Sequence, residues 1–185
     1  MDGEKKSRKS PSDGAEEENK MATRAHKQLK AEHNSRGMAE WLSLSEPYNV
    51  MFKLTELALL PHNLSLPQLH LLSVLKEAGG ILTTGEIGRA MVKASQTITG
   101  LADRLEEPGL VERVFDRSDR RKTWVRLTPK GQRKWEEAVP VANRLAGEIL
   151  SALTEEELRE LQAKSAKLRT AAIERLAEAL GRPSS

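Results

Sequence analysis

The residues best suited to chemistry lie between Leu110 and Gly131, in a segment crowded with arginine and lysine. From Arg113 to Lys134 the chain has nine basic and two acidic residues, a local charge of +7 in a protein whose net charge is only +3. Cationic side chains concentrated in this way are the electrostatic footprint expected of contact with nucleic acid phosphates. A solvated hairpin kept soluble by its arginines is the alternative.

Two short strands are predicted in this segment, at residues 110–115 and 123–127, because both are rich in valine, leucine, threonine and aromatic residues. The loop between them has no apolar residue, so we expect it to project into solvent. Asp119 would be repelled by phosphate and is expected to shape the loop by pairing with Arg113 or Arg121. The loop residues expected to touch DNA are Arg117, Arg120, Arg121 and Lys122.

Two short helices joined by a turn are predicted just before the basic hairpin. Thr83 and Glu86 form a capping box at the start of the first helix. The second helix buries Ile98 and Leu105 and turns a polar face outward. Glutamine can pair bidentately with adenine, and serine and threonine can donate to or accept from base edges. The residues proposed to read DNA are Ser95, Gln96, Thr97, Thr99 and Arg104; a helix cap at Ser95 and a space-filling Thr97 are the alternatives.

A helix pair followed by a basic hairpin predicts a winged helix-turn-helix, in which one helix enters the major groove and the hairpin reaches the neighbouring minor groove. The fold class expected is mainly α with a small β-hairpin, to which Ile81-Leu82 could add a third strand. Pro140 is expected to bend or divide the helix that follows the hairpin. The predicted organisation is an extension (1–37), a dimerisation helix (38–62), the winged helix-turn-helix (63–131) and C-terminal dimerisation helices (132–181).

Composition excludes several other classes. The chain has no cysteine, which removes disulfides, thiolate zinc sites and cysteine-based redox sensing. It has no apolar run near the roughly 18 residues of a membrane span and no secretory pattern at its start, so a cytoplasmic protein is expected. No catalytic motif is found, and neither an enzyme nor a cofactor is predicted. A metal sensor using His62 and His70 with a carboxylate is a minor alternative.

Several motifs together resemble the MarR (multiple antibiotic resistance regulator) family. They are Ser65-Leu66-Pro67-Gln68, Leu101-Ala102-Asp103-Arg104-Leu105, Gly109-Leu110-Val111-Glu112-Arg113, Asp119-Arg120-Arg121 and Val125-Arg126-Leu127-Thr128-Pro129-Lys130-Gly131. The resemblance covers about residues 40–176, with Pro108 and Trp124 as departures. It implies an obligate homodimer and a small ligand, often an aromatic acid or phenol. The residues on or near elements that would line such a ligand pocket are Trp41, Tyr48, Phe52, His62 and His70.

Apolar stripes on the first and last predicted helices also favour a dimer, because a winged helix alone cannot cover both. The function predicted is a dimeric transcription regulator that binds double-stranded DNA, a repressor released from a pseudo-palindromic operator by a small ligand. An architectural DNA-binding protein without an effector is the alternative.

Overall fold

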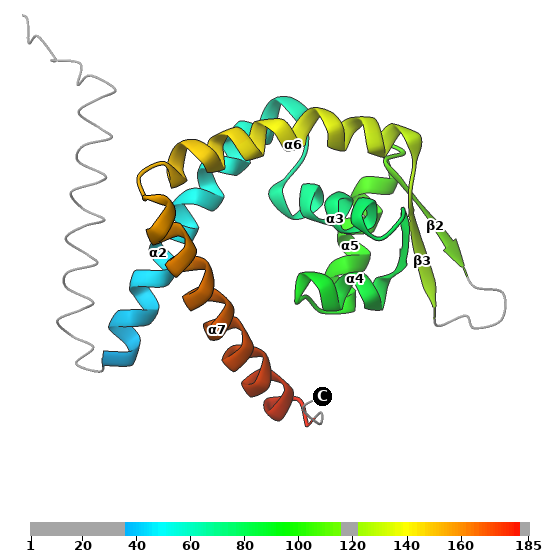
Figure 1. The fold of residues 1–185 in the computed structure, drawn as a ribbon. Helices are drawn as coiled ribbons and strands as arrows, with labels where there is room; N and C mark the ends of the chain where they lie inside the picture. The colour runs from blue at the N-terminus through cyan, green and yellow to red at the C-terminus, as the bar shows by residue number, and fades with distance from the viewer. Residues whose placement is uncertain (1–35, 116–121, 182–185) are drawn as a thin grey trace, which may run out of the picture. The chain divides into compact units, whose positions relative to one another are not determined.

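The computed structural model describes residues 36–115 and 122–181 (Figure 1). They belong to two compact units, residues 1–51 and 52–185, whose boundary falls inside the first described helix. That helix, α2 (Arg36–Leu59), begins before the predicted start at residue 38 and runs through Pro47. The Ser43 hydroxyl donates to the Glu40 carbonyl at 2.9 Å and the Ser45 hydroxyl to the Leu42 carbonyl at 3.2 Å.

The second unit has the element order of a winged helix. After the end of α2 come the short 3-10 helix η1 (Leu60–His62), α3 (Leu66–Glu77), β1 (Ile81–Thr83), α4 (Thr84–Met91) and α5 (Ser95–Glu106). They are followed by β2 (Val111–Phe115), β3 (Thr123–Leu127), α6 (Pro129–Leu150) and α7 (Glu155–Ala179). Among the described helices, none combines the length and the apolar character that crossing a bilayer would require.

The starts of these helices follow the capping signals in the sequence. Ser65, Thr83 and Thr154 each accept a hydrogen bond from the third residue of their helix, whose side chain accepts in return from the cap backbone. Thr128 caps α6 by accepting from the Gly131 N–H at 3.0 Å. These caps satisfy backbone donors that have no partner within the helix, so α3, α4, α6 and α7 begin at the predicted residues.

A three-stranded antiparallel sheet has the order β1-β3-β2, so the suggested third strand is present. β1 pairs with β3 through Leu82 opposite Val125, and β2 pairs with β3 through Arg113 opposite Val125. We call β2, β3 and the loop between them the wing (Figure 1).

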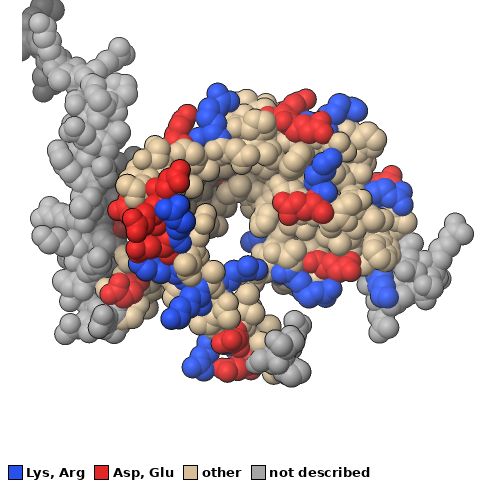
Figure 2. All heavy atoms as spheres, in the orientation of Figure 1, with Lys and Arg blue, Asp and Glu red and all other residues tan. Residues whose placement is uncertain are grey.

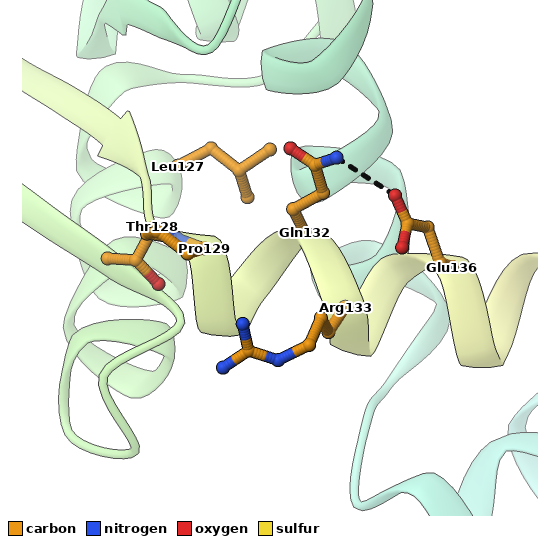
Figure 3. Close-up of a pocket in the computed structure, with 6 residues that line it drawn as sticks. All are labelled: Leu127, Thr128, Pro129, Gln132, Arg133 and Glu136. Atoms are coloured by element: carbon orange, nitrogen blue, oxygen red, sulfur yellow. Dashed lines mark hydrogen bonds between the residues drawn. The ribbon is translucent and has the colours of Figure 1, made fainter.

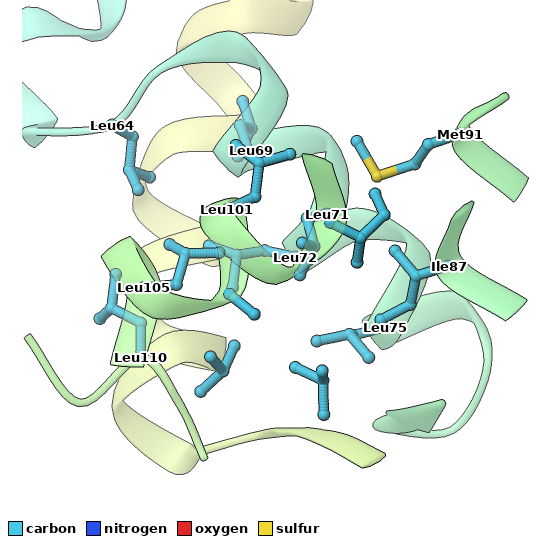
Figure 4. Close-up of a cluster of buried hydrophobic side chains, with 14 of the residues drawn as sticks. Leu64, Leu69, Leu71, Leu72, Leu75, Ile87, Met91, Leu101, Leu105 and Leu110 are labelled. Carbon is cyan, nitrogen blue, oxygen red and sulfur yellow. The ribbon is translucent and has the colours of Figure 1, made fainter. Parts of the chain in front are cut away.

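One apolar core joins α3, α4, α5, the sheet and the first half of α6 (Figure 4). Leucines dominate it because the chain has only 3% aromatic residues. Helical spacing of Ile98, Leu101 and Leu105 buries one face of α5 and leaves the opposite face in solvent. The buried residues are Leu59, Leu64, Leu69, Leu71, Leu72, Leu75, Ile87, Met91, Ile98, Leu101, Ala102, Leu105, Leu110, Val111, Val125 and Ala138.

Helix α6 leaves this core near its middle. Trp135 packs against the core, and its indole N–H donates to the Ser73 hydroxyl of α3 at 2.9 Å. The ammonium group of Lys76 lies 5.9 Å from the centre of the same ring. Of the two effects expected of Pro140, division does not occur, because α6 continues unbroken from Pro129 to Leu150. The proline is exposed.

Candidate DNA interface

Helix α5 presents the predicted polar face to solvent. Ser95, Gln96, Thr97, Thr99 and Arg104 are all exposed. Helical spacing turns Gln96, Thr99 and Arg104 away from the buried Ile98, whereas Ser95 lies beside the buried face. The Thr99 hydroxyl donates to the Ser95 carbonyl at 3.0 Å, which leaves its lone pairs available to an outside donor.

The two alternatives for α5 are not what the structure shows. The residue before the helix is Ala94, so Ser95 is the first helical residue and not its cap. The methyl side chain of Ala94 cannot accept a hydrogen bond from the helix N-terminus. Its backbone carbonyl accepts from the N–H groups of Thr97 and Ile98. Thr97 is exposed and fills no space in the core.

A close approach of backbone to backbone makes the turn between α4 and α5 tight. The Lys93 N–H donates to the Gly88 carbonyl at 2.8 Å, and a Cβ placed on Gly88 would lie 2.8 Å from the Lys93 carbonyl oxygen. Val92 has φ of 52° and is 55% exposed. A β-branched residue in this left-handed conformation is strained. Neither residue was predicted from the sequence, although a glycine three residues before the last residue of α4 was a usable signal.

The wing is tied to α5 through Arg113. Its backbone N–H donates to Glu106 Oε1 at 2.8 Å, and its Nε donates to Glu106 Oε2 at 2.7 Å. Its Nη1 forms an ion pair with Asp103. The Arg113 backbone N–H, together with its guanidinium group, holds the pKa of Glu106 below its ordinary value despite the opposing effect of partial burial. Among the described residues, the side-chain partners of Arg113 are therefore residues of α5.

Several basic residues of the +7 segment are engaged within the protein. Arg126 Nη1 lies 2.5 Å from Glu112 Oε1 on the neighbouring strand. Lys130 Nζ donates to the Pro108 carbonyl at 2.7 Å, and Lys134 lies 3.5 Å from Glu137. Lys122 is exposed at the start of β3. On the face drawn in Figure 2, basic side chains (blue) and acidic side chains (red) lie interspersed.

The base of the wing is locked against the loop that follows α5. The Thr128 hydroxyl lies 2.8 Å from the Gly109 carbonyl oxygen and 3.1 Å from that of Leu110. A Cβ placed on Gly131 would lie 1.9 Å from the Leu110 carbonyl oxygen, which no side chain could accommodate. This contact gives the Leu-Thr-x-x-Gly pattern a physical reason: threonine caps α6 and binds the loop, while glycine lets the loop approach.

The centre of the loop in the wing lies outside the described residues. The roles predicted for Arg117, Asp119, Arg120 and Arg121 therefore stay predictions.

The residues predicted for a ligand pocket divide between the two units. Trp41 and Tyr48 belong to the first unit and are 67% and 57% exposed. Phe52, His62 and His70 belong to the second, where Phe52 and His62 are half-buried and His70 is exposed. Their role as pocket residues stays a prediction. A pocket of about 300 Å³ lies at the start of α6 (Figure 3). Its walls come from Leu127, Thr128, Pro129, Gln132, Arg133 and Glu136, and Gln132 Nε2 donates to Glu136 Oε1 at 2.9 Å.

The metal-sensor alternative has no support in the part of the chain that the structure describes, where no three histidine or carboxylate residues gather in a way that could hold an ion.

Comparison with known proteins supports the winged-helix assignment. The family model described as MarR family matches residues 62–122. The HTH-type transcriptional repressor MdtR of Bacillus subtilis is 37% identical over 105 residues, which cover 57% of this chain and 67% of that protein. The HTH-type transcriptional regulator YsmB of the same organism is 35% identical over 79 residues, and that match spans only about half of YsmB, 54% of its length.

Solved structures share the fold. The organohalide-sensing regulator RdhR-CbdbA1625 in its ligand-free form superposes with a TM-score of 0.72 at 22% identity, over 78% of this chain and 85% of that one. Its 2,4-dichlorophenol-bound form gives a TM-score of 0.71, also at 22% identity. An α5 that buries one face, a three-stranded sheet with the wing and a MarR-type sequence occur together in one unit. The chain therefore belongs to the MarR family of winged helix-turn-helix, DNA-binding transcription regulators, and not to a class of enzymes.

Proposed function

We propose that this regulator is a homodimeric repressor, which a small aromatic or phenolic ligand releases from a pseudo-palindromic operator. The observation that carries the proposal is the exposed polar face of α5 beside a wing fastened to it. Gln96 and Thr99 share that face with Arg104. Lys122, the residue directly before β3, is also exposed. Such a surface suits base edges in the major groove and phosphate at the adjoining minor groove.

Dimerisation is supported by apolar side chains that the described residues leave in solvent. Leu168 on α7 is 54% exposed and Leu176 is 46% exposed. Exposed apolar rows of this kind mark protein interfaces. In the second unit they comprise Leu54, Leu57, Leu60, Leu150, Leu153, Leu161, Leu168, Ile173, Leu176 and Leu180; in the first they comprise Met38, Trp41, Leu44, Tyr48 and Val50.

A symmetric dimer would present two copies of α5 about one DNA turn apart, roughly 34 Å. An operator with two similar half-sites follows from that symmetry, and we expect the interface to bury more than about 2,000 Å², as obligate dimers do. A protein that binds chromosomal DNA in this way is expected in the cytoplasm.

The test of DNA reading is selection of binding sites from random duplexes, followed by footprinting of the selected site. Gln96→Ala should then lower the preference for that site over random DNA by about 1–3 kcal/mol, because one base contact is lost. Lys122→Ala should weaken both kinds of DNA alike and reduce the salt slope by about one unit. Equal weakening of both DNAs by Gln96→Ala would remove Gln96 as a reader.

The ligand part of the proposal draws on the 2,4-dichlorophenol named for the similar regulator. Phenols and aromatic carboxylates are the compounds to screen for release of the selected operator. Release by one of them, with a saturable dose response, is the expected result. An operator complex that none of them weakens would favour the architectural alternative.

A further inference from the structure

Three side chains connect the recognition helix α5 to the wing: Asp103 and Glu106 from the helix, and Arg113 from β2. We call them the helix–wing clamp. Both oxygens of Glu106 are used, one by the Arg113 backbone N–H at 2.8 Å and the other by its Nε at 2.7 Å. Asp103 forms an ion pair with Nη1 of the same guanidinium group. A planar guanidinium bound to two carboxylates has a fixed orientation, which a flexible ammonium group cannot reproduce.

Asp103 has a position that works against phosphate binding. Gln96, Thr99 and Asp103 recur at three- and four-residue spacing, so they share one face of α5. The Asp103 side chain is 50% exposed, whereas that of Arg113 is only 28% exposed. By charge alone, a carboxylate on a DNA-facing surface lowers affinity for every duplex. Its ion pair with Arg113 fixes the orientation of β2 relative to α5, and this offsets the electrostatic cost.

The neighbouring ion pair serves as an internal comparison. Arg126 and Glu112 have side chains 51% and 49% exposed, and they pair across β3 and β2 within the sheet. In the part of the chain that the structure describes, neither residue of this pair bonds to α5, whereas the clamp joins α5 to β2. The two arginines lie on adjacent strands and have the same charge, so they differ mainly in what they connect.

We infer that Arg113 is a positioning residue: through Asp103 and Glu106 it fixes the wing relative to the recognition helix, so that both engage only DNA of the right sequence and groove shape. This rests on the proposed function, because it assumes that α5 and the wing contact one operator. Loss of the clamp then frees the wing to bind phosphate without regard to what α5 reads. Specific affinity falls, while affinity for random DNA does not.

The test compares four variants of the full-length chain on a selected operator and on random duplex DNA at one salt concentration. Asp103→Ala and Arg113→Lys open the clamp, and Glu112→Ala and Arg126→Lys are their matched controls. Asp103→Ala should lower the operator-to-random affinity ratio about tenfold, a coupling within the range measured for contacting residues. Random DNA should bind as tightly as before or more tightly, because a negative charge is gone. Glu112→Ala should change both affinities by the same factor.

Arg113→Lys keeps the charge and should lower the ratio, whereas Arg126→Lys should not. In the Arg113→Lys background, Lys122→Ala should also cost operator affinity less than in the wild type. If Arg113→Lys fails to fold, Asp103→Ala still decides the question, because Asp103 is an exposed helical residue whose replacement should be tolerated. Equal changes on both DNAs in Asp103→Ala would overturn the inference while the proposed function stands. A wild-type protein with no preferred sequence would overturn the proposed function and this inference with it.

Discussion

Of the described glycines, Gly131 has the least room for a side chain, because the first turn of α6 meets the backbone of Leu110 there. A methyl group there would lie 1.9 Å from a carbonyl oxygen, and neither backbone can move without breaking the Thr128 contacts. Gly131→Ala should therefore lower the free energy of unfolding by about 3 kcal/mol, as overpacking does. Urea denaturation followed by circular dichroism measures it.

The control for that change is Gly147→Ala in the same helix. No atom lies within 4 Å of a Cβ placed there, so alanine should stabilise by about 0.5–1 kcal/mol through its helix propensity. Equal effects at the two glycines would show that close approach is not what the position of Gly131 requires.

Val92 holds a left-handed conformation with φ of 52° and is 55% exposed. Asparagine tolerates this conformation, so Val92→Asn should raise the free energy of unfolding by about 1 kcal/mol. A shift of the urea midpoint without a change in slope is the expected observation. A destabilised variant would mean that the valine side chain makes a favourable contact that outweighs the backbone strain.

At the scale of single residues, the sequence could predict which side chains of α5 face solvent. Helical spacing fixes them once the buried positions Ile98, Leu101 and Leu105 are known. It could not predict the partners of Arg113. Asp103 and Glu106 lie within ten residues of it, but their approach depends on how the sheet packs on α5. The same limit applies to the +7 charge count, part of which is neutralised by contacts such as Arg126 with Glu112.

At the scale of elements, the junction between α5 and β2 should weaken in acid. The folded pKa of Glu106 lies below its ordinary value of 4.5, so its bonds to Arg113 contribute fully above about pH 4.5. That contribution is lost as the pH falls through the lower, folded pKa. Glu106→Gln should therefore be less stable than the wild type at pH 7, and the gap should narrow in acid. Parallel stability profiles of the two proteins from pH 7 to pH 3 would contradict this.

Helix starts were predictable element by element, because Ser65, Thr83, Thr128 and Thr154 are local signals that need no tertiary context. The effect of Pro140 was less predictable. Whether a proline divides a helix depends on what its neighbours can pack against, and α6 remains one helix through it. The early start of α2 was not predicted, although serine, a residue type that favours helix starts, directly precedes Arg36 in the sequence.

At the scale of the whole molecule, the proposed dimer makes folding and association one event. Leu168→Glu introduces a charge into the exposed apolar row of α7 and should convert a micromolar dimer into monomer, with loss of tight operator binding. Truncation after Thr154 should do the same. Sedimentation velocity measures both.

Ala163→Glu is the matched control, because Ala163 lies on the opposite side of α7 by helical spacing and receives the same charge. It should remain a dimer. A folded dimer that survives the truncation would show that the last helix is not part of the interface.

The contact of Trp135 with Ser73 and Lys76 makes the indole a natural optical probe. Its emission depends on the hydrogen bond at 2.9 Å and on the ammonium group near its ring, both supplied by α3. With Trp41 and Trp124 replaced by phenylalanine, the remaining fluorescence would report on the seam between α3 and α6 alone. A ligand that shifts one helix against the other would then change the wavelength or intensity of this emission. The measurement needs neither a label nor DNA.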